Sequence, residues 1–243
     1  MKHLTAAAFA CLAGAASAQQ TGITIGMQLE PPHLDPTSAA AAAIDEVVYA
    51  NVYEGLTRFG PDGSVLPGLA ESWEIADDGL SYDFHLREGV TFHDGAALTA
   101  EDVVYSIDRA RAEDSTNAQK ALFDSIDEVT AVDDLMVEIT LKQPNGALLF
   151  TLAWGDAVIV DESDVDTLTT NPVGTGAFMF KDWVEGERVE LVRNPDYWGE
   201  PVALESATFK FISDPTAAFA AMMAGDIDAF PVFPAPENLA PFE

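Results

Sequence analysis

Asn171-Pro172-Val173-Gly174-Thr175-Gly176-Ala177-Phe178 is the most informative stretch of this chain of 243 residues. It lacks the GK[ST] ending of a phosphate-binding P-loop, and its glycines do not follow the GxGxxG spacing of a dinucleotide-binding turn. Glycine adopts positive φ without steric cost, so we expect the two glycines to shape a turn where one strand leaves another. The stretch therefore predicts a structural junction and not a catalytic loop.

Strand patterns and helix patterns alternate along the rest of the chain, which is typical of an α/β protein. Residues 81–87 give the clearest strand, because Tyr82, Phe84 and Leu86 alternate with polar residues and share one face. Similar patterns predict further strands at residues 21–29, 137–141, 189–191, 209–211 and 227–232.

Two helices are predicted in the first half of the chain. Within residues 39–59, apolar residues recur at helical spacing and form one stripe. Residues 99–111 carry a second helical pattern, and Thr99 followed three residues later by Asp102 fits a capping box at its start.

A third helix is marked at both ends. Asp214 suits the N-cap, Pro215 the first helical position and Gly225 the residue after the last turn. We expect Phe219, Met222 and Met223 to form its buried face.

The first residues carry the pattern of a secretory signal. Lys2 and His3 precede an apolar run at residues 4–15, and small residues at 16–18 form a cleavage site. The run is shorter than the about 20 residues that span a bilayer. Residues 1–18 therefore predict a cleaved signal peptide and a periplasmic mature protein. Cys11 is the only cysteine and lies within the signal, so we expect no disulfide.

The charge of the chain is strongly acidic, with 41 Asp and Glu against 11 Lys and Arg. Since Lys2 lies in the signal, the mature balance is 10 − 41 = −31. Such a field repels nucleic-acid phosphates and anionic lipids, so neither nucleic-acid binding nor direct membrane insertion is expected. The acids could attract a cationic solute, but their scattered distribution favours a solvated acidic surface.

Metal and cofactor patterns are weak. His33 with Asp35, or His93 with Asp94, could offer metal ligands, but neither has the spacing of a helical zinc pair. We therefore predict no metal and no cofactor.

Catalytic patterns are equally weak. Acidic pairs such as Asp77-Asp78 and Asp133-Asp134 precede strands, where turn formation explains them. No GxSxG nucleophile elbow is present. A secreted acidic hydrolase that uses a carboxylate pair stays open as an alternative, but we predict no enzyme.

Nine segments in a fixed order resemble the solute-binding proteins of peptide-type ABC importers, extracellular family 5, the dipeptide, oligopeptide and nickel group. They lie at residues 34–36, 51–56, 67–73, 78–87, 92–95, 99–106, 172–178, 193–199 and 224–228. The resemblance implies a periplasmic-binding-protein lobe of type II with an additional α/β subdomain. Residues 19–52 and 171–243 would form the main sheet of the first lobe, and residues 53–170 the additional subdomain. Family members continue into a second lobe, so the resemblance also implies an N-terminal fragment.

The resemblance further implies that a solute binds between the lobes. Positions near the contact are Ala40 and Ala42, with Phe123 as a weaker candidate and Trp154 in a cleft-lining region. Core packing is the favoured alternative for Trp154.

The expected partners are a di- or oligopeptide, or a related small solute, and the ABC permease subunits, with the protein itself a monomer. A periplasmic peptide chaperone or sensor is a third interpretation.

Overall fold

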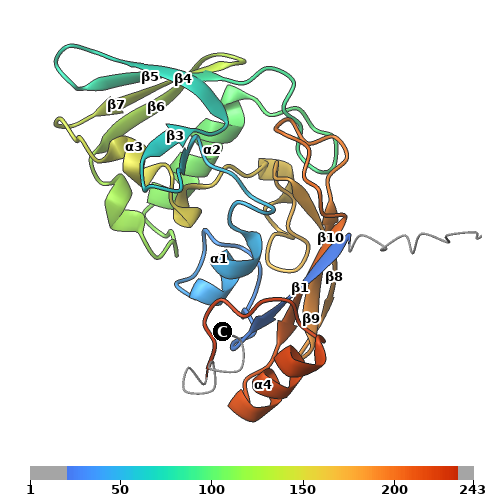
Figure 1. Cartoon of the computed structure of the whole chain (residues 1–243). Coiled ribbons are helices and arrows are strands. Elements are labelled where there is room, and N and C mark those ends of the chain that lie inside the picture. Colours follow the sequence, from blue (N-terminus) through green and yellow to red (C-terminus); the bar gives the residue numbers. More distant parts are fainter. Residues whose placement is uncertain (1–20, 235–243) are drawn as a thin grey trace, which may run out of the picture.

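The computed structural model describes residues 21–234, so the expected signal peptide at 1–18 lies outside the described residues. One layer of the molecule is a mixed sheet. Its strands, in spatial order, are β1 (Gly22–Met27), β10 (Ser206–Phe211), β9 (Arg188–Arg193) and β8 (Phe178–Val184). β1 runs parallel to β10, and β10, β9 and β8 are antiparallel. Segments far apart in sequence therefore build this sheet together (Figure 1).

A second, antiparallel sheet lies at the other end of the molecule (Figure 1). Its strands, in spatial order, are β4 (Ala70–Ile75), β5 (Ser81–Leu86), β7 (Met136–Leu141) and β6 (Ile126–Asp133). The hairpin of β2 (Thr57–Phe59) and β3 (Val65–Pro67) lies beside it. Helix α2 (Ala100–Arg111) packs against β6, and the short α3 (Leu148–Thr151) contacts β2. The predicted strand faces hold, because Tyr82, Phe84 and Leu86 are all buried.

The predicted helix ends are confirmed where the signals are local. At the start of α2, the Asp102 carboxylate accepts hydrogen bonds from the Thr99 backbone N–H (2.8 Å) and hydroxyl (2.9 Å). Helix α4 (Pro215–Ala224) begins after Asp214, whose carboxylate accepts from the Ala217 N–H at 2.8 Å. Gly225 follows with φ 75°, the left-handed conformation that glycine adopts readily.

Two predictions are affected by tertiary packing: the helix within residues 39–59 is confirmed but is shorter than its pattern, and the buried face predicted for α4 is wrong. Within residues 39–59 the helix α1 covers only Ala42–Val48, because the chain turns at Ala50 (φ 57°) and buries Tyr53 in extended structure. In α4, Ala218 is the buried residue and Met223 is 56% exposed. The helix is apolar on every side, so its sequence carries no period that selects a face.

The expected strand at residues 227–232 is a single parallel bridge between Ala229 and Ile25 of β1.

Two hydrophobic cores correspond to the two sheets. One gathers under the β4–β7 sheet around Phe84, Phe92 and Ile107, and the other under the β1 sheet around Tyr53 and Phe209. The division at residues 53–170 stays a prediction, and the cores differ from it at several residues. Tyr53 packs in the core of the β1 sheet, and Val173 packs in the core of the other sheet. The late subdomain residues Val158, Val160 and Leu168 pack in the core of the β1 sheet.

The junction between the cores explains the two glycines of residues 171–178. Neither Gly174 nor Gly176 has positive φ, so the expected turn conformation is wrong. A Cβ on Gly174 would instead collide with the carbonyl oxygen of Val52, and one on Gly176 with that of Asn51. The glycines are required because two backbones approach closely. No helix in residues 21–234 has both the length and the apolar composition to cross a bilayer.

Candidate solute-binding groove

A cavity of about 350 Å³ lies at the carboxyl end of β1, and we call it the β1 groove. Its walls are residues 26–30 at the end of β1, residues 41–43 at the start of α1, Glu46 further along the same helix, and residues 230–232 after α4. In α/β sheets, ligands bind outside the carboxyl ends of the strands, where the chain leaves the sheet in different directions. The volume falls in the range of about 300–1,000 Å³ that is usual for small-molecule sites.

The charged side chains of the β1 groove are acidic. Glu30 and Glu46 line it, and no Lys or Arg is among its described lining residues. Glu30 is held in place because its Oε1 accepts hydrogen bonds from Trp183 Nε1 and from the Gly186 N–H, both at 2.9 Å. The charged groups that the groove presents are therefore negative.

Of the four predicted contact residues, Ala42 lines the groove and Ala40, Phe123 and Trp154 do not. Ala42 is exposed and lines it, whereas Ala40 is exposed on the approach and does not. Phe123 is 1% exposed in the core of the subdomain, where packing accounts for its ring. The structure thus places Ala42 at the groove and Phe123 in a core.

Trp154 also lies outside the groove lining. It is 39% exposed and makes edge contacts with Phe59 and Phe150, with ring centroids 6.4 and 6.0 Å away. Trp154 therefore packs in a half-exposed aromatic cluster and not in the core, which was the favoured alternative from the sequence. Contact between Trp154 and a solute stays a prediction.

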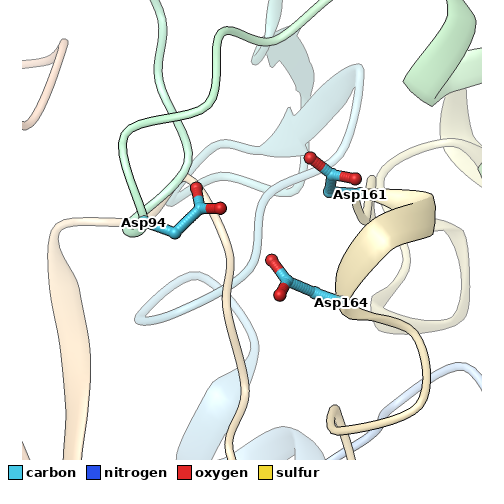
Figure 2. Close-up of side chains that lie close together, drawn as sticks. All are labelled: Asp94, Asp161 and Asp164. Carbon is cyan, nitrogen blue, oxygen red and sulfur yellow. The ribbon is translucent and has the colours of Figure 1, made fainter.

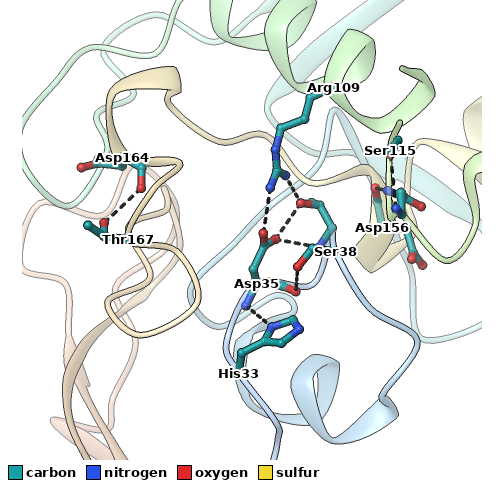
Figure 3. Close-up of polar contacts among 10 residues, drawn as sticks. His33, Asp35, Ser38, Arg109, Ser115, Asp156, Asp164 and Thr167 are labelled. Atoms are coloured by element: carbon teal, nitrogen blue, oxygen red, sulfur yellow. Dashed lines mark hydrogen bonds and ion pairs between the residues drawn. The ribbon is translucent and has the colours of Figure 1, made fainter. Parts of the chain in front are cut away.

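A buried ion pair fixes the segment that leads into α1. Asp35, which is 2% exposed, pairs with Arg109 of α2 at 2.8 Å and accepts a hydrogen bond from the Thr37 N–H at 2.9 Å (Figure 3). Burial alone would raise the pKa of Asp35, but the hydrogen bonds from Thr37 and Arg109 outweigh it and lower the pKa. The pair thus ties residues 35–37, which precede α1, to helix α2.

An acidic pair is formed by Asp45 on helix α1 and Asp156. Burial, together with the nearby charge of Asp156, raises the pKa of Asp45 on α1 to about 6. Asp45 Oδ1 is buried and has no hydrogen-bond partner within residues 21–234, and it lies against Gly155, where a Cβ would meet it at 2.6 Å. Asp156 is 8% exposed, and its backbone carbonyl accepts from Asn117 Nδ2 at 2.8 Å.

The histidine candidate His93 has a structural role. Its Nε2 lies 2.9 Å from the Gly176 carbonyl, and its Nδ1 accepts from the Gly174 N–H at 3.3 Å. This pattern fits a neutral ring with the proton on Nε2. Burial lowers the pKa of His93, and the bond to Gly176 and the charge of Asp94 only partly oppose this. Both ring nitrogens are used, so His93 does not serve as a metal ligand in this arrangement.

Asp94, the neighbour of His93, joins Asp161 and Asp164 in an acidic cluster (Figure 2). One oxygen from each lies within 4.8 Å of the others, a spacing that could hold a divalent cation. Burial, with the charges of Asp94 and Asp161, raises the pKa of Asp164. Asp94 is exposed and the other two are half-buried, as is common in a chain this acidic, so we assign the cluster no metal.

The polar and C-terminal walls of the groove were not predicted from the sequence. Glu30 follows a Met-Gln-Leu sequence at a strand end, and Glu46 lies one helical turn after Ala42. Both residues could have been predicted as groove residues if the carboxyl end of β1 had been assumed to be the binding site. Residues 230–232 give no local signal, because they reach the groove only through the bridge at Ala229.

These features define a class: a lobe of a periplasmic-type binding protein with a solute-sized groove at its first strand. Solved structures agree. The AgaA binding protein of A. tumefaciens R10 in complex with agropinic acid matches with a TM-score of 0.85 at 29% identity, over 90% of this chain and 45% of that one. AppA of Bacillus subtilis in complex with a nonapeptide matches with a TM-score of 0.80 at 29% identity, over 87% and 44%.

The chain belongs to family 5 of the bacterial extracellular solute-binding proteins, whose "Middle" family model matches residues 64–243. A curated relative, the glutathione-binding protein GsiB of Pectobacterium atrosepticum, is 35% identical over 206 residues, which are 82% of this chain and 40% of the relative. The chain thus spans less than half the length of these relatives. The family and fold class predicted from the sequence are confirmed.

Proposed function

We propose that this protein is the periplasmic substrate-binding component of a peptide-type ABC importer and captures a di- or oligopeptide or a related small solute. The β1 groove carries the proposal, because it offers a ligand-sized space in a family of solute-binding proteins. The names of GsiB, a glutathione binder, and AppA, bound to a nonapeptide, support a peptide. AgaA, bound to agropinic acid, supports a non-peptide solute as the alternative.

The groove chemistry favours a solute with a positive group. A peptide supplies one at its amino terminus, and Glu30 and Glu46 are the charged side chains placed to meet it. Ala41 and Ala42 have small side chains, so the wall formed by α1 leaves room for varied residues of the solute. We therefore expect a preference for neutral and cationic peptides over acidic ones.

We propose binding without chemistry on the solute. The hydrolase alternative needs an accessible carboxyl group with a raised pKa. The pKa of Asp164 is raised, but Asp164 does not line the β1 groove, and the pKa of Asp45 is raised to about 6. Its Oδ1 is buried against Gly155, however, and its neighbour Asp156 is also buried. Neither Asp45 nor Asp156 lines the β1 groove, so a solute held there does not meet this pair.

Peptide uptake by cells tests the proposal. Cells that lack the gene should lose uptake of a labelled peptide, and the wild-type gene should restore it. Ala42→Trp places a large ring in the β1 groove and should fail to restore uptake, whereas Ala42→Ser, which adds one oxygen, should succeed. Normal uptake in the deletion strain would contradict the transport role and favour a peptide chaperone or sensor.

A further inference from the structure

A second cavity, of about 680 Å³, shares no lining residue with the β1 groove. It lies where the β2–β3 hairpin meets the loop after β9. Arg58 of β2 and Arg87, the residue after β5, line it together with Tyr197 and Trp198 of that loop. We call it the Arg58–Arg87 pocket.

The two arginines are anchored through their Nε atoms to the carbonyls of two consecutive residues. Arg58 Nε donates to the Pro67 carbonyl at 3.0 Å, and Arg87 Nε donates to the carbonyl of the next residue, Gly68, at 2.7 Å. The Arg87 guanidinium also lies over the Trp198 ring, 4.7 Å from its centroid. These contacts hold both groups and leave their terminal nitrogens without a hydrogen bond to any residue in 21–234. Preorganised guanidinium groups of this kind suit planar carboxylates.

The absence of ion pairs at these arginines is unexpected in this chain. Acidic residues outnumber basic ones 41 to 11. In the described part of the chain, the other arginines each lie within 4.0 Å of a carboxylate, and they are Arg109, Arg111, Arg188 and Arg193. Arg58 and Arg87 are the exceptions, and they line the same cavity.

Glu54, a half-buried acid among the lining residues, is already occupied. Its Oε2 accepts from Trp198 Nε1 at 2.7 Å and from the Thr175 hydroxyl at 3.0 Å, and its Oε1 accepts from the Tyr197 hydroxyl at 2.9 Å. Glu200 is the other acidic lining residue, and it is exposed. Glu54 therefore orients the two aromatic residues, and the guanidinium groups remain available to an incoming anion.

We propose that the Arg58–Arg87 pocket binds a small organic carboxylate, whose carboxylate group lies between the two guanidinium groups and whose apolar part lies against Pro67 and Pro201. The cavity volume favours a small molecule over an acidic side chain of a partner protein. The pocket is separate from the β1 groove, so this binding does not depend on the proposed transport function.

Two-dimensional NMR of the purified protein tests the pocket through the Trp198 indole N–H, with succinate as the probe and the uncharged succinamide as its match. Succinate should shift the Trp198 indole signal in a saturable manner, and succinamide should not. Arg58→Gln should weaken binding roughly tenfold, because one charge-assisted contact is lost, and Arg58→Lys should lose less. The control Lys142→Gln removes an exposed positive charge outside the pocket and should leave binding unchanged.

Three outcomes would overturn the proposal. The first is an indole signal that does not respond to succinate. The second is binding by Arg58→Gln as tight as that of the folded wild type. The third is a loss of succinate binding in Lys142→Gln as large as that in Arg58→Gln, which would mean that binding depends on the net charge of the protein alone.

Discussion

The Asp45→Asn substitution should stabilise the protein at neutral and alkaline pH. Asp45 has a pKa of about 6, raised first by burial and then by the charge of Asp156, against 3.8 for an ordinary aspartate. Its ionised form is therefore less favourable in the folded protein than in the unfolded chain. An asparagine has nearly the same shape and carries no charge, so it removes this cost.

The sign and the size of the effect follow from the shift. A folded-state pKa above the unfolded value gives a stabilising contribution that is complete below pH 3.8 and is lost as the pH rises through about 6. The shift of about 2 pKa units corresponds to about 3 kcal/mol at most. Asp45 is only partly buried, and solvent screening reduces this to about 1–2 kcal/mol. The gain should thus be small near about pH 4, grow as the pH rises to about 6, and be complete above about pH 7.

Urea unfolding followed by far-UV circular dichroism, at about pH 8 and about pH 4.5, measures the difference between variant and wild type. Glu46→Gln is the control, because it removes the same charge from the exposed neighbour on α1. It should change the free energy of unfolding little at either pH. The reasoning is refuted if Asp45→Asn gains nothing at the higher pH, or if Glu46→Gln gains as much.

Three further substitutions test the junction between the two sheets by the same unfolding assay. Asp35→Asn should lower the free energy of unfolding by about 2–3 kcal/mol, because it leaves the charge of Arg109 without its buried partner; a loss below about 0.5 kcal/mol would contradict this. Gly176→Ala should cost about 1–3 kcal/mol, because its Cβ meets the Asn51 carbonyl, and unchanged stability would show that the backbones can separate. His93 has a lowered pKa and contributes stability above about pH 6.5 that is lost as the pH falls. His93→Gln should therefore flatten the acid side of the stability profile, and an unchanged profile would assign that slope to other groups.

Local signals in the sequence predicted the fold well. The capping box at Thr99 and Asp102, and the Asp214 and Gly225 ends of α4, involve residues within a few positions of each other. Their geometry therefore depends on neighbouring residues and can be predicted without knowledge of tertiary contacts. The strand at residues 81–87 was also predicted correctly, because burial of one face imposes a period of two on the sequence.

Non-local contacts account for the errors. The end of α1 is set by the burial of Tyr53, and the role of Gly176 is set by a carbonyl that comes from residue 51. Neither partner can be read from the surrounding residues. The β1 groove could not be predicted from the sequence for the same reason. Gly26 and Phe230 lie together in its wall because Ile25 of β1 forms a bridge with Ala229. The family resemblance supplied Ala42, but the chemistry of Glu30 and Glu46 required the structure.

Isothermal titration calorimetry of the protein purified from its source, with short peptides of positive, neutral and negative charge, tests the central claim most directly. We expect saturable binding of at least one neutral or cationic peptide, and mass spectrometry should show that the peptide recovered afterwards is intact. Binding should be lost in Ala42→Trp but not in Ala42→Ser. Cleavage of the peptide, or binding that Ala42→Trp leaves intact, would contradict solute capture in the β1 groove.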